Sequence, residues 1–423
     1  MNKLFGKILK IFVSVCCAMM LLAVSLPVSA AGKKSFSAGG IIYEHIGTDG
    51  LNVRVIGFDA EAVEDNGENE AVDAEAEDEK TVDSGNAYVP GRQLVIPAQV
   101  TYGETEYNVT EIGNAAFAFS DLETIEISDG IASIGASAFT GSGELKSVII
   151  PKSITKIGDG VFSYCPMLGD IDISEDNQDF VFIGGILYSK DKKQVYRITD
   201  TAGDTADIAK GAAKIRPYAC EGNSAVKTVI LPEKLKKICQ GAFMDCDSLK
   251  QIEIPASVTK IEGNPFMYCD KLEKISVSSS NKQFYTSSEG LLLNKKQTLL
   301  ISASAAKGRV VIPSGIKRIA AGAATGNTSI TAVELSSSVY AIDAYAFADC
   351  TALKEVRFAT RNVKLNGVSE DISGSTAGNG SIFKNTDYFI NFKIPYSSDF
   401  NTEGSLEEMI RRNSPKGVMI TLR

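Results

Sequence analysis

Short groups of alternating apolar and polar residues recur along the chain. Examples are LETIEI (122–127), LKSVIIP (145–151), LKQIEIP (249–255) and LKEVRF (353–358). Alternation over a few positions predicts a short strand with one buried face. Between Ile127 and Phe358, successive strand ends are 23 or 35 residues apart, so the basic unit is 23 residues long. The predicted strand ends are Ile96, Ile127, Ile150, Ile173, Ile208, Leu231, Ile254, Val277, Ile312, Leu335, Phe358 and Ile394.

A second phrase follows the same period. It reads IGNAAF at 112, IGASAF at 134, IGDGVF at 157 and ICQGAF at 238, with more divergent copies at 215, 261, 319 and 342. We expect the positions of Ile134 and Phe139 to form buried columns in a stack of such units. The glycine after the isoleucine fits a tight corner where a side chain would be crowded, although other copies show that it is favoured rather than required.

The two 35-residue units share a further pattern. Residues 177–198 and 281–301 each contain an apolar triplet, a Lys-rich polar turn and another apolar triplet. This order predicts an inserted β-hairpin in each long unit. The strand ends before the two insertions, Ile173 and Val277, are 104 residues apart, which indicates that a block of four units has been duplicated.

A 23-residue unit lies within the roughly 20–29 residues of leucine-rich repeats, and stacked units of this kind bury a shared core. The predicted fold is a leucine-rich-repeat solenoid. It has a parallel sheet of short strands on the concave face, turns or short helices on the convex face, two inserted β-hairpins and non-standard caps. The predicted segments are a signal peptide (1–30), an N-terminal cap (33–110) with an acidic disordered insertion at about 60–86, the repeats (111–360) and a C-terminal degenerate coil and cap (361–423). The caps are expected to include a hairpin at 39–58 and a short helix at 405–412.

The repeated phrases resemble those of the BspA-like leucine-rich-repeat proteins. The resemblance rests on the IGxxAFxxC phrase, the 23-residue step and the GGILYSKD hairpin, and it covers roughly residues 39–396. It implies a surface or secreted bacterial protein associated with adhesion to host proteins and other cells. The family offers no catalytic residues to transfer, and it implies no cofactor.

The first residues have the features of a secretory signal peptide. Lys3, Lys7 and Lys10 precede an apolar run of 16 residues from Ile11 to Leu26, and small residues suitable for cleavage follow. The run is shorter than the roughly 20 residues that span a membrane. We therefore expect a secreted protein, extracellular or associated with the cell surface, with no membrane span after cleavage.

The acidity of the chain is local. Its formal net charge is −9, and residues 61–80 alone contain ten Asp and Glu and one Lys. Such a run, without hydrophobic periodicity, indicates a solvated loop. No basic patch is evident in the sequence, which disfavours a nucleic-acid partner.

The residues for catalysis are scarce. The chain contains one histidine, His45, in the predicted N-terminal hairpin. Ser137 lies two residues after Gly135, as in the Gly-x-Ser turn that can present a nucleophile, but the equivalent position holds Ala115, Gly160 or Tyr218 in other copies. We therefore predict no catalytic residue, no cofactor and no metal site, and interpret Ser137 as a permissive position of the repeat.

Six cysteines follow the leader: Cys165, Cys220, Cys239, Cys246, Cys269 and Cys350. Four of them lie three residues after the phenylalanine position of the repeat, and none belongs to a C-x-x-C motif. We expect buried thiols packed as small hydrophobic groups. A disulfide between Cys246 and Cys269, in adjacent units, remains an alternative.

Residues between the two buried positions of each strand should face solvent on the concave side. We expect the binding surface there, at Glu126, Asp172, Glu253, Glu334 and Arg357, beside the apolar Ile149 and Ile230. The favoured function is a non-catalytic scaffold, expected to be monomeric, that binds an extracellular protein or cell-surface ligand. The alternatives are a self-assembling envelope or matrix component and a carbohydrate-active enzyme with a carboxylate pair.

Overall fold

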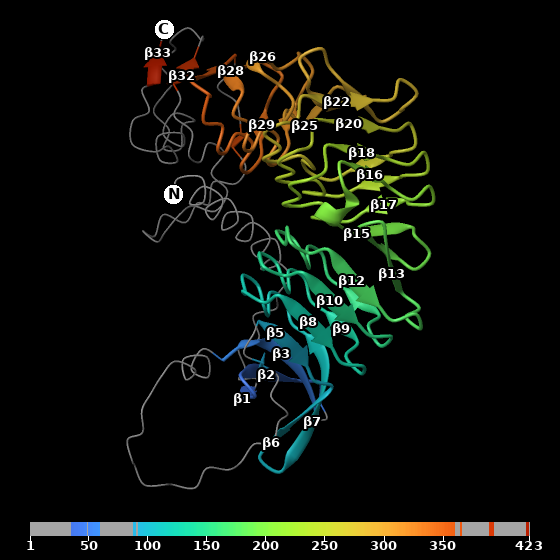
Figure 1. Ribbon diagram of the computed structural model, residues 1–423. Coiled ribbons are helices and arrows are strands. Elements are labelled where there is room, and N and C mark those ends of the chain that lie inside the picture. The colour runs from blue at the N-terminus through green and yellow to red at the C-terminus, as the bar shows by residue number, and fades with distance from the viewer. Residues whose placement is uncertain are drawn as a thin grey trace. The chain divides into compact units, whose positions relative to one another are not determined.

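The computed structural model describes residues 35–48, 50–59 and 92–359, with short strands at 88–89, 364–365, 389–392 and 420–422 (Figure 1). The predicted leader (1–30), acidic insertion (60–86) and helix (405–412) lie outside the described residues. The chain divides into two compact units, Met1–Phe182 (unit 1) and Ile183–Arg423 (unit 2), and each is described by itself. Both are parallel β-solenoids of stacked coils, as the repeats predict.

One set of strands, all but β4 three to six residues long and here called the long strands, forms three separate sheets. The alternation of apolar and polar residues explains each one, because the apolar positions are buried and the intervening position faces outward. In unit 1 the sheet contains β4 (Tyr88–Val89), β5 (Gln93–Ile96), β8 (Thr124–Ile127), β10 (Ser147–Ile150) and β12 (Asp170–Ile173). In unit 2 the first sheet contains β16 (Thr205–Asp207), β18 (Thr228–Ile230), β20 (Gln251–Ile254) and β22 (Lys274–Val277). The second contains β26 (Gly308–Val311), β28 (Ile330–Leu335), β30 (Glu355–Phe358), β32 (Phe389–Phe392) and β33 (Ile420–Leu422).

The repeated IG phrase begins with a two-residue strand, here called a short strand, where turns or short helices were expected. These short strands pair in parallel from coil to coil, as Lys214–Lys237–Lys260 do. They are β9 (Ser133–Ile134), β11 (Lys156–Ile157), β17 (Lys214–Ile215), β19 (Lys237–Ile238), β21 (Lys260–Ile261), β27 (Arg318–Ile319), β29 (Ala341–Ile342) and β31 (Lys364–Leu365). In the described ranges the helical content is a single 3₁₀ turn, η2 (Asp200–Ala202), and no helix there is long and apolar enough to cross a membrane.

The Ile and Phe columns form the core as predicted. Ile134 is 2% exposed and Phe139 is fully buried. The rings of Phe117, Phe139 and Phe162 stack in unit 1 with centroids 5.7 Å apart, and Phe243 and Phe266 repeat this spacing in unit 2. The glycine after the isoleucine is explained by close approach, because a Cβ on Gly158 would lie 2.3 Å from the backbone nitrogen of Ala136 in the preceding coil.

Ser137 occupies a left-handed turn with φ of 56°. The same backbone conformation recurs at the equivalent Ala115, Tyr218 and Tyr345, with φ between 54° and 60°. The strain that a Gly-x-Ser turn indicates is therefore real, but it belongs to the repeat. Ser137 itself is 7% exposed.

Three antiparallel meanders precede the parallel short strands. In unit 1, β1 (Ser35–Ala38), β2 (Ile41–Ile46) and β3 (Asn52–Phe58) lead into β7 (Thr105–Ile112), which also pairs with β6 (Gln99–Tyr102). β13 (Phe180–Ile183) follows β12 in the chain, and in unit 2 β14 (Ile186–Ser189) and β15 (Gln194–Ile198) pair antiparallel before β17. The third meander, β23 (Phe284–Thr286), β24 (Leu292–Asn294) and β25 (Leu299–Ser302), leads to β27. GGIIY (39–43) and GGILY (184–188) are the shared sequence signal, so the N-terminal hairpin is a further copy of the inserted device.

In unit 2, the 35-residue coil contains two strands, β25 and β26, that pair with strands of the next coil. It lacks the turn that follows the short strand in the 23-residue coils, and we call it the turnless coil. The turns on either side of it meet directly, because the Tyr268 amide donates to the Thr325 carbonyl at 3.1 Å and Asn264 Nδ2 to the Gly322 carbonyl at 2.8 Å. The coil between them joins β25 to β26 through a tight turn, in which the Ala306 amide donates to the Ala303 carbonyl at 3.0 Å. The long strands of unit 2 therefore form two sheets, whereas the spacing of strand ends alone predicts an unbroken stack.

Buried polar side chains connect successive coils. Asn177 Nδ2 donates to the carbonyls of Pro151 and Ile154 at 2.9 and 3.0 Å, and its Oδ1 accepts from the Asp179 and Phe180 amides. Asn281, 104 residues later, makes the same four bonds, to Pro255, Val258, Gln283 and Phe284. Buried carbonyls need such partners, so these asparagines fasten the start of each insertion.

Candidate binding surfaces

The outward position of each long strand forms a row that runs from coil to coil, here called the central row. In unit 1 it is Val95, Glu126, Ile149 and Asp172, which pair in register. In unit 2 it is Asp207, Ile230, Glu253 and Ser276 on the first sheet, and Val311, Glu334 and Arg357 on the second. All five predicted site residues lie on this row, and the structure divides them into three groups.

Glu126 and Asp172 flank Ile149 in unit 1. Both carboxylates are exposed, and Ile149 is 44% exposed between them. Lys146 lies one position before the strand and pairs with Glu123 at 2.5 Å, next to the sheet. This part of the row therefore presents an aliphatic side chain between two carboxylates.

Glu253 lies in a shallow depression of about 380 Å³ on the first long-strand sheet of unit 2. Ile230 (49% exposed) contributes its apolar wall, and Lys274, Ser276 and Glu233 contribute polar groups. The depression therefore combines an apolar wall with two carboxylates and an amine.

Glu334 and Arg357 pair with each other, with Arg357 Nη1 2.9 Å from Glu334 Oε1. Arg309 joins Glu334 at 2.6 Å and Glu355 at 3.1 Å, and Arg357 closes the cycle on Glu355 at 2.6 Å. The hydrogen bond from Arg357 lowers the pKa of Glu355, and it raises the pKa of Arg357 in turn. These two predicted site residues thus form a cross-strand ion-pair network, which reduces their freedom to meet a partner.

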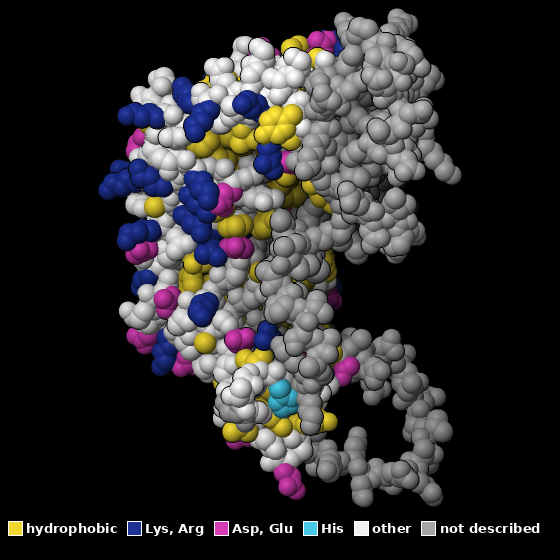
Figure 2. All heavy atoms as spheres, turned by 180° about the vertical axis from the view of Figure 1, so that it is seen from behind, with side chains coloured by type: hydrophobic (Ala, Val, Ile, Leu, Met, Phe, Trp, Pro, Cys, Tyr) yellow, Lys and Arg dark blue, Asp and Glu magenta, His cyan; other side chains and the backbone are white. Residues whose placement is uncertain are grey.

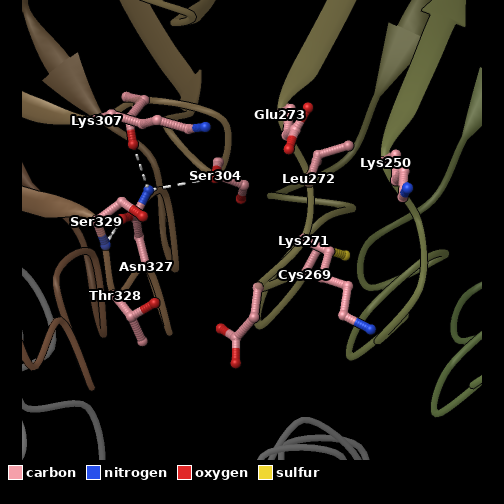
Figure 3. Close-up of a pocket in the computed structure, with 12 residues that line it drawn as sticks. Lys250, Cys269, Lys271, Leu272, Glu273, Ser304, Lys307, Asn327, Thr328 and Ser329 are labelled. Atoms are coloured by element: carbon pink, nitrogen blue, oxygen red, sulfur yellow. Dashed lines mark hydrogen bonds between the residues drawn. The ribbon is translucent and has the colours of Figure 1, made fainter.

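Two crevices open where the turnless coil interrupts unit 2. One, of about 210 Å³, lies between the coil of Lys250–Glu273 and the segments around Ser304 and Asn327 (Figure 3). Lys250 and Lys271 line it from one side and Lys307 from the other. The other, of about 420 Å³, lies beside the hairpin and is lined by Tyr285, Lys295 and serines. Neither is lined by a residue that the sequence predicted for the binding surface.

The two units differ in charge, a feature that the whole-chain balance conceals. Residues 183–359 contain 24 Lys and Arg against 17 Asp and Glu, a formal net charge of +7. The described residues of unit 1 contain 5 Lys and Arg against 16 Asp and Glu, a net charge of −11. Figure 2 shows Lys and Arg side chains gathered over unit 2. Counting charges separately on each side of residue 183 would have revealed this segregation.

The groups considered for catalysis lie in structural roles. His45 packs against the rings of Phe36 and Tyr107 at 5.5 and 5.1 Å. The six cysteines of the described residues are all buried and unbridged, so the Cys246–Cys269 disulfide does not form. Burial raises the pKa of Cys239 to about 11 and that of Cys350 to about 12. No group of three or more His, Cys, Asp or Glu placed to hold a metal ion occurs in the described part of the chain.

The cysteines also make a regular hydrogen bond that the sequence pattern did not reveal. The thiols of Cys165, Cys246, Cys269 and Cys350 each donate to the carbonyl 26 residues earlier, at 2.9–3.2 Å. Ser142 makes the same bond to Phe117 at 3.2 Å. Position 165 and the equivalent positions of the other coils therefore favour a small side chain that can donate a hydrogen bond.

Comparison with known proteins identifies the repeat. The family model described as "BspA type Leucine rich repeat region" matches residues 98–184, 205–288 and 304–369. The chain belongs to the BspA-type leucine-rich-repeat family. The gaps in the match, 185–204 and 289–303, contain β14 and β15 and β24 and β25, respectively.

Solved structures of bacterial leucine-rich-repeat proteins are similar to this chain. A leucine-rich cell surface protein from Faecalibacterium prausnitzii is 21% identical, with 85% of this chain and 96% of that chain covered and a TM-score of 0.38. A leucine-rich-repeat protein from Eubacterium ventriosum is 16% identical, with 83% and 100% covered and a TM-score of 0.42. The pneumococcal vaccine antigen PcpA is 15% identical, with 92% and 99% covered and a TM-score of 0.33. No curated protein matches the chain.

Proposed function

We propose that this protein is a non-catalytic binding scaffold outside the cell, and that it recognises an extracellular protein or cell-surface ligand through the central row. The observation that supports it best is the exposure of aliphatic side chains on a regular β surface. Ile149, Ile230 and Val311 are 44%, 49% and 50% exposed, each beside charged residues of the same row. Exposed apolar groups bordered by polar ones are typical of protein-recognition surfaces.

Family membership supports the extracellular part of the proposal. The leader-like first residues and the surface location named for the Faecalibacterium relative agree with it. A repeat scaffold suits recognition because its strands hold side chains at fixed spacing with little conformational freedom left to lose.

A binding screen of purified residues 32–423 against host matrix proteins and cell surfaces tests the proposal. For any ligand found, Ile230→Ser combined with Glu253→Ala should weaken binding by about tenfold or more, because buried interface side chains each contribute on the order of 1–2 kcal/mol. Met167→Ser, at an exposed apolar residue (54%) away from the row, is the matched control and should leave binding unchanged. A screen with no binding above background would remove the support for adhesion.

Self-assembly into an envelope or matrix component is the second candidate, tested by light scattering at increasing concentration. A strict monomer would count against it.

The enzyme alternative rests on Glu233 and Glu253, which line the same depression. Glu253→Gln should abolish any glycan cleavage if the two act as a pair.

A further inference from the structure

Five lysines gather along one side of the short strands of unit 2: Lys193, Lys214, Lys236, Lys237 and Lys260. We call them the basic row. Lys214, Lys237 and Lys260 are the first residues of β17, β19 and β21 and stand side by side in register. Lys193 and Lys236 occupy the preceding corner, where their carbonyls accept the amides of Ala213 and Thr259 at 2.8 and 2.9 Å. Successive coils therefore place the backbones of Lys214, Lys237 and Lys260 about 4.8 Å apart, the spacing of paired strands.

The row is accessible and carries excess positive charge. The side chains of Lys193 and Lys260 are 67% and 62% exposed, and Lys236 is exposed as well. Two carboxylates lie against the row. Glu262 pairs with Lys237 at 2.7 Å and with Lys260 at 2.8 Å, and Asp191 pairs with Lys193 at 3.1 Å. Within the described residues, Lys214 and Lys236 form no ion pair.

The fold does not require these lysines. In unit 1 the same two positions hold Thr110 and Glu111, Ala132 and Ser133, and Thr155 and Lys156, with the same coil-to-coil backbone bonds. The coils stack equally well with neutral or acidic residues there. Adjacent like charges cost free energy, so their accumulation in unit 2 calls for an anionic partner.

We propose that the basic row binds a linear anionic polysaccharide lying along the stacking direction. A straight line of regularly spaced amines complements a polymer with regularly repeated anionic groups. Lysine ammonium groups are compact, rotatable donors that do not impose the planar bidentate geometry of arginine. This surface is separate from the central row, and its function does not depend on that of the central row.

The surroundings favour a polysaccharide over a nucleic acid or a membrane. Base stacking needs an open aromatic face, but the Tyr196 ring beside the row is covered by the Arg216 guanidinium at 4.4 Å. Insertion into a lipid surface needs exposed apolar side chains, and the large exposed hydrophobic residues in the described part of unit 2, Ile183, Ile230, Val311 and Tyr340, lie outside the segments that carry the row.

Isothermal titration of the purified protein with heparin tests the proposal. We expect binding whose affinity falls linearly with the logarithm of salt concentration, because counterions are released. The triple variant Lys214→Gln, Lys236→Gln, Lys237→Gln should bind at least about tenfold more weakly. The control triple variant Lys146→Gln, Lys152→Gln, Lys156→Gln removes the same charge from unit 1 and should change affinity by less than about twofold.

Glu262→Gln provides a test in the opposite direction. It removes the carboxylate that neutralises Lys237 and Lys260, so it should strengthen heparin binding by about threefold to tenfold. Circular dichroism confirms folding of each variant. Equal losses in the two triple variants, or no gain in Glu262→Gln, would overturn the proposal.

Parallel titrations identify the anionic group and exclude other partners. Loss of binding to desulfated heparin would assign sulfate, and retained binding would assign carboxylate. Tighter binding to double-stranded DNA, or to vesicles of anionic phospholipid, at equal charge concentration would refute a polysaccharide site.

Discussion

Units 1 and 2 are built from the same 23-residue coil, yet their described residues carry net charges of −11 and +7. Their cores are interchangeable: stacked phenylalanines, buried isoleucines, an asparagine at each insertion and thiols donating to carbonyls. Their outward positions differ in charge. The comparison shows that inward columns specify the coil, whereas the outward columns vary in charge without disturbing it.

Removing a core ring should have the largest effect, and it should be equal in both units. Phe139→Ala and Phe243→Ala each delete a fully buried ring from a stack, so each should lower the free energy of unfolding by about 3–5 kcal/mol. Urea unfolding followed by circular dichroism measures this. Phe119→Ala, at a 45% exposed ring, should cost less than about 0.5 kcal/mol. A large difference between Phe139→Ala and Phe243→Ala would break the equivalence of the two cores.

Asn177 and Asn281, which lie at the start of the two insertions, should contribute equally to the free energy of unfolding. Asn177→Ala and Asn281→Ala each remove four hydrogen bonds, two to carbonyls of the preceding coil and two from amides just after the asparagine, so each should cost about 2–3 kcal/mol. Thermal unfolding of both variants is the measurement. The neighbouring exposed Gln178→Ala and Lys282→Ala are matched controls that should be neutral. If one asparagine proved dispensable, the two insertions would not be held in the same way.

The Cys239 and Cys350 thiols of unit 2 should be inert despite the positive charge of that unit. Burial raises the pKa of Cys350 to about 12 and that of Cys239 to about 11, so these thiols stay protonated at pH 8 and ionise only as the pH approaches those values. We expect Cys239 and Cys350 to react with Ellman's reagent at least about a hundredfold more slowly in the folded protein than in urea. Rapid reaction of either thiol at pH 8 without denaturant would contradict its burial.

At the left-handed turn position of the repeat, a substitution to glycine should raise the free energy of unfolding, and a substitution of glycine by alanine should lower it. Ser137→Gly should stabilise unit 1 by about 0.5–1 kcal/mol, and Gly160→Ala should cost a similar amount. Gly241→Ala in unit 2 should cost more, because the new Cβ would lie 2.7 Å from the Tyr218 ring. Unfolding midpoints of the three variants decide the order. Destabilisation by Ser137→Gly would show that the hydroxyl has a role of its own.

The ion-pair network on β26, β28 and β30 should have the smallest effect. The pKa of Glu355 is lowered by Arg357 in the folded state, so its contribution is present above the unfolded pKa and is lost as pH falls through the folded pKa. Glu355→Gln should therefore lower stability slightly at pH 7 and have no effect at pH 2, and added salt should reduce the difference. An effect that persists at pH 2 would point to packing instead of charge.

Much of the fold can be predicted from the sequence because the long strands and corners of each repeat are formed by residues close together in the chain. Period-two alternation predicted the long strands to within a residue at most ends, and only the last, at Ile394, lies two residues beyond its strand β32. The corner glycine and the buried columns were predicted for the right reason. The two-residue strands were not, because two residues are too short for any periodicity, and their pairing depends on the neighbouring coil. The shared GGIIY and GGILY segments are a sequence signal for the same antiparallel hairpin in both places.

The candidate site was predicted as a row, and the structure separates its members. Glu126 and Glu253 remain exposed beside aliphatic residues, whereas Glu334 and Arg357 pair across strands. Sequence spacing places residues on one face, but it does not show which charges meet, since that depends on side chains from three different coils.

The sequence by itself therefore determined the coil: its length, its strands, its buried columns and its family. Each of these depends on contacts within one unit or on a period repeated many times. Only the tertiary structure decided how coils meet: the turnless coil that splits the sheets of unit 2, the ion-pair network, and the alignment of lysines from separate coils into one row. These features arise from residues 20 to 60 positions apart, whose proximity is set by stacking and not by any local preference of the chain.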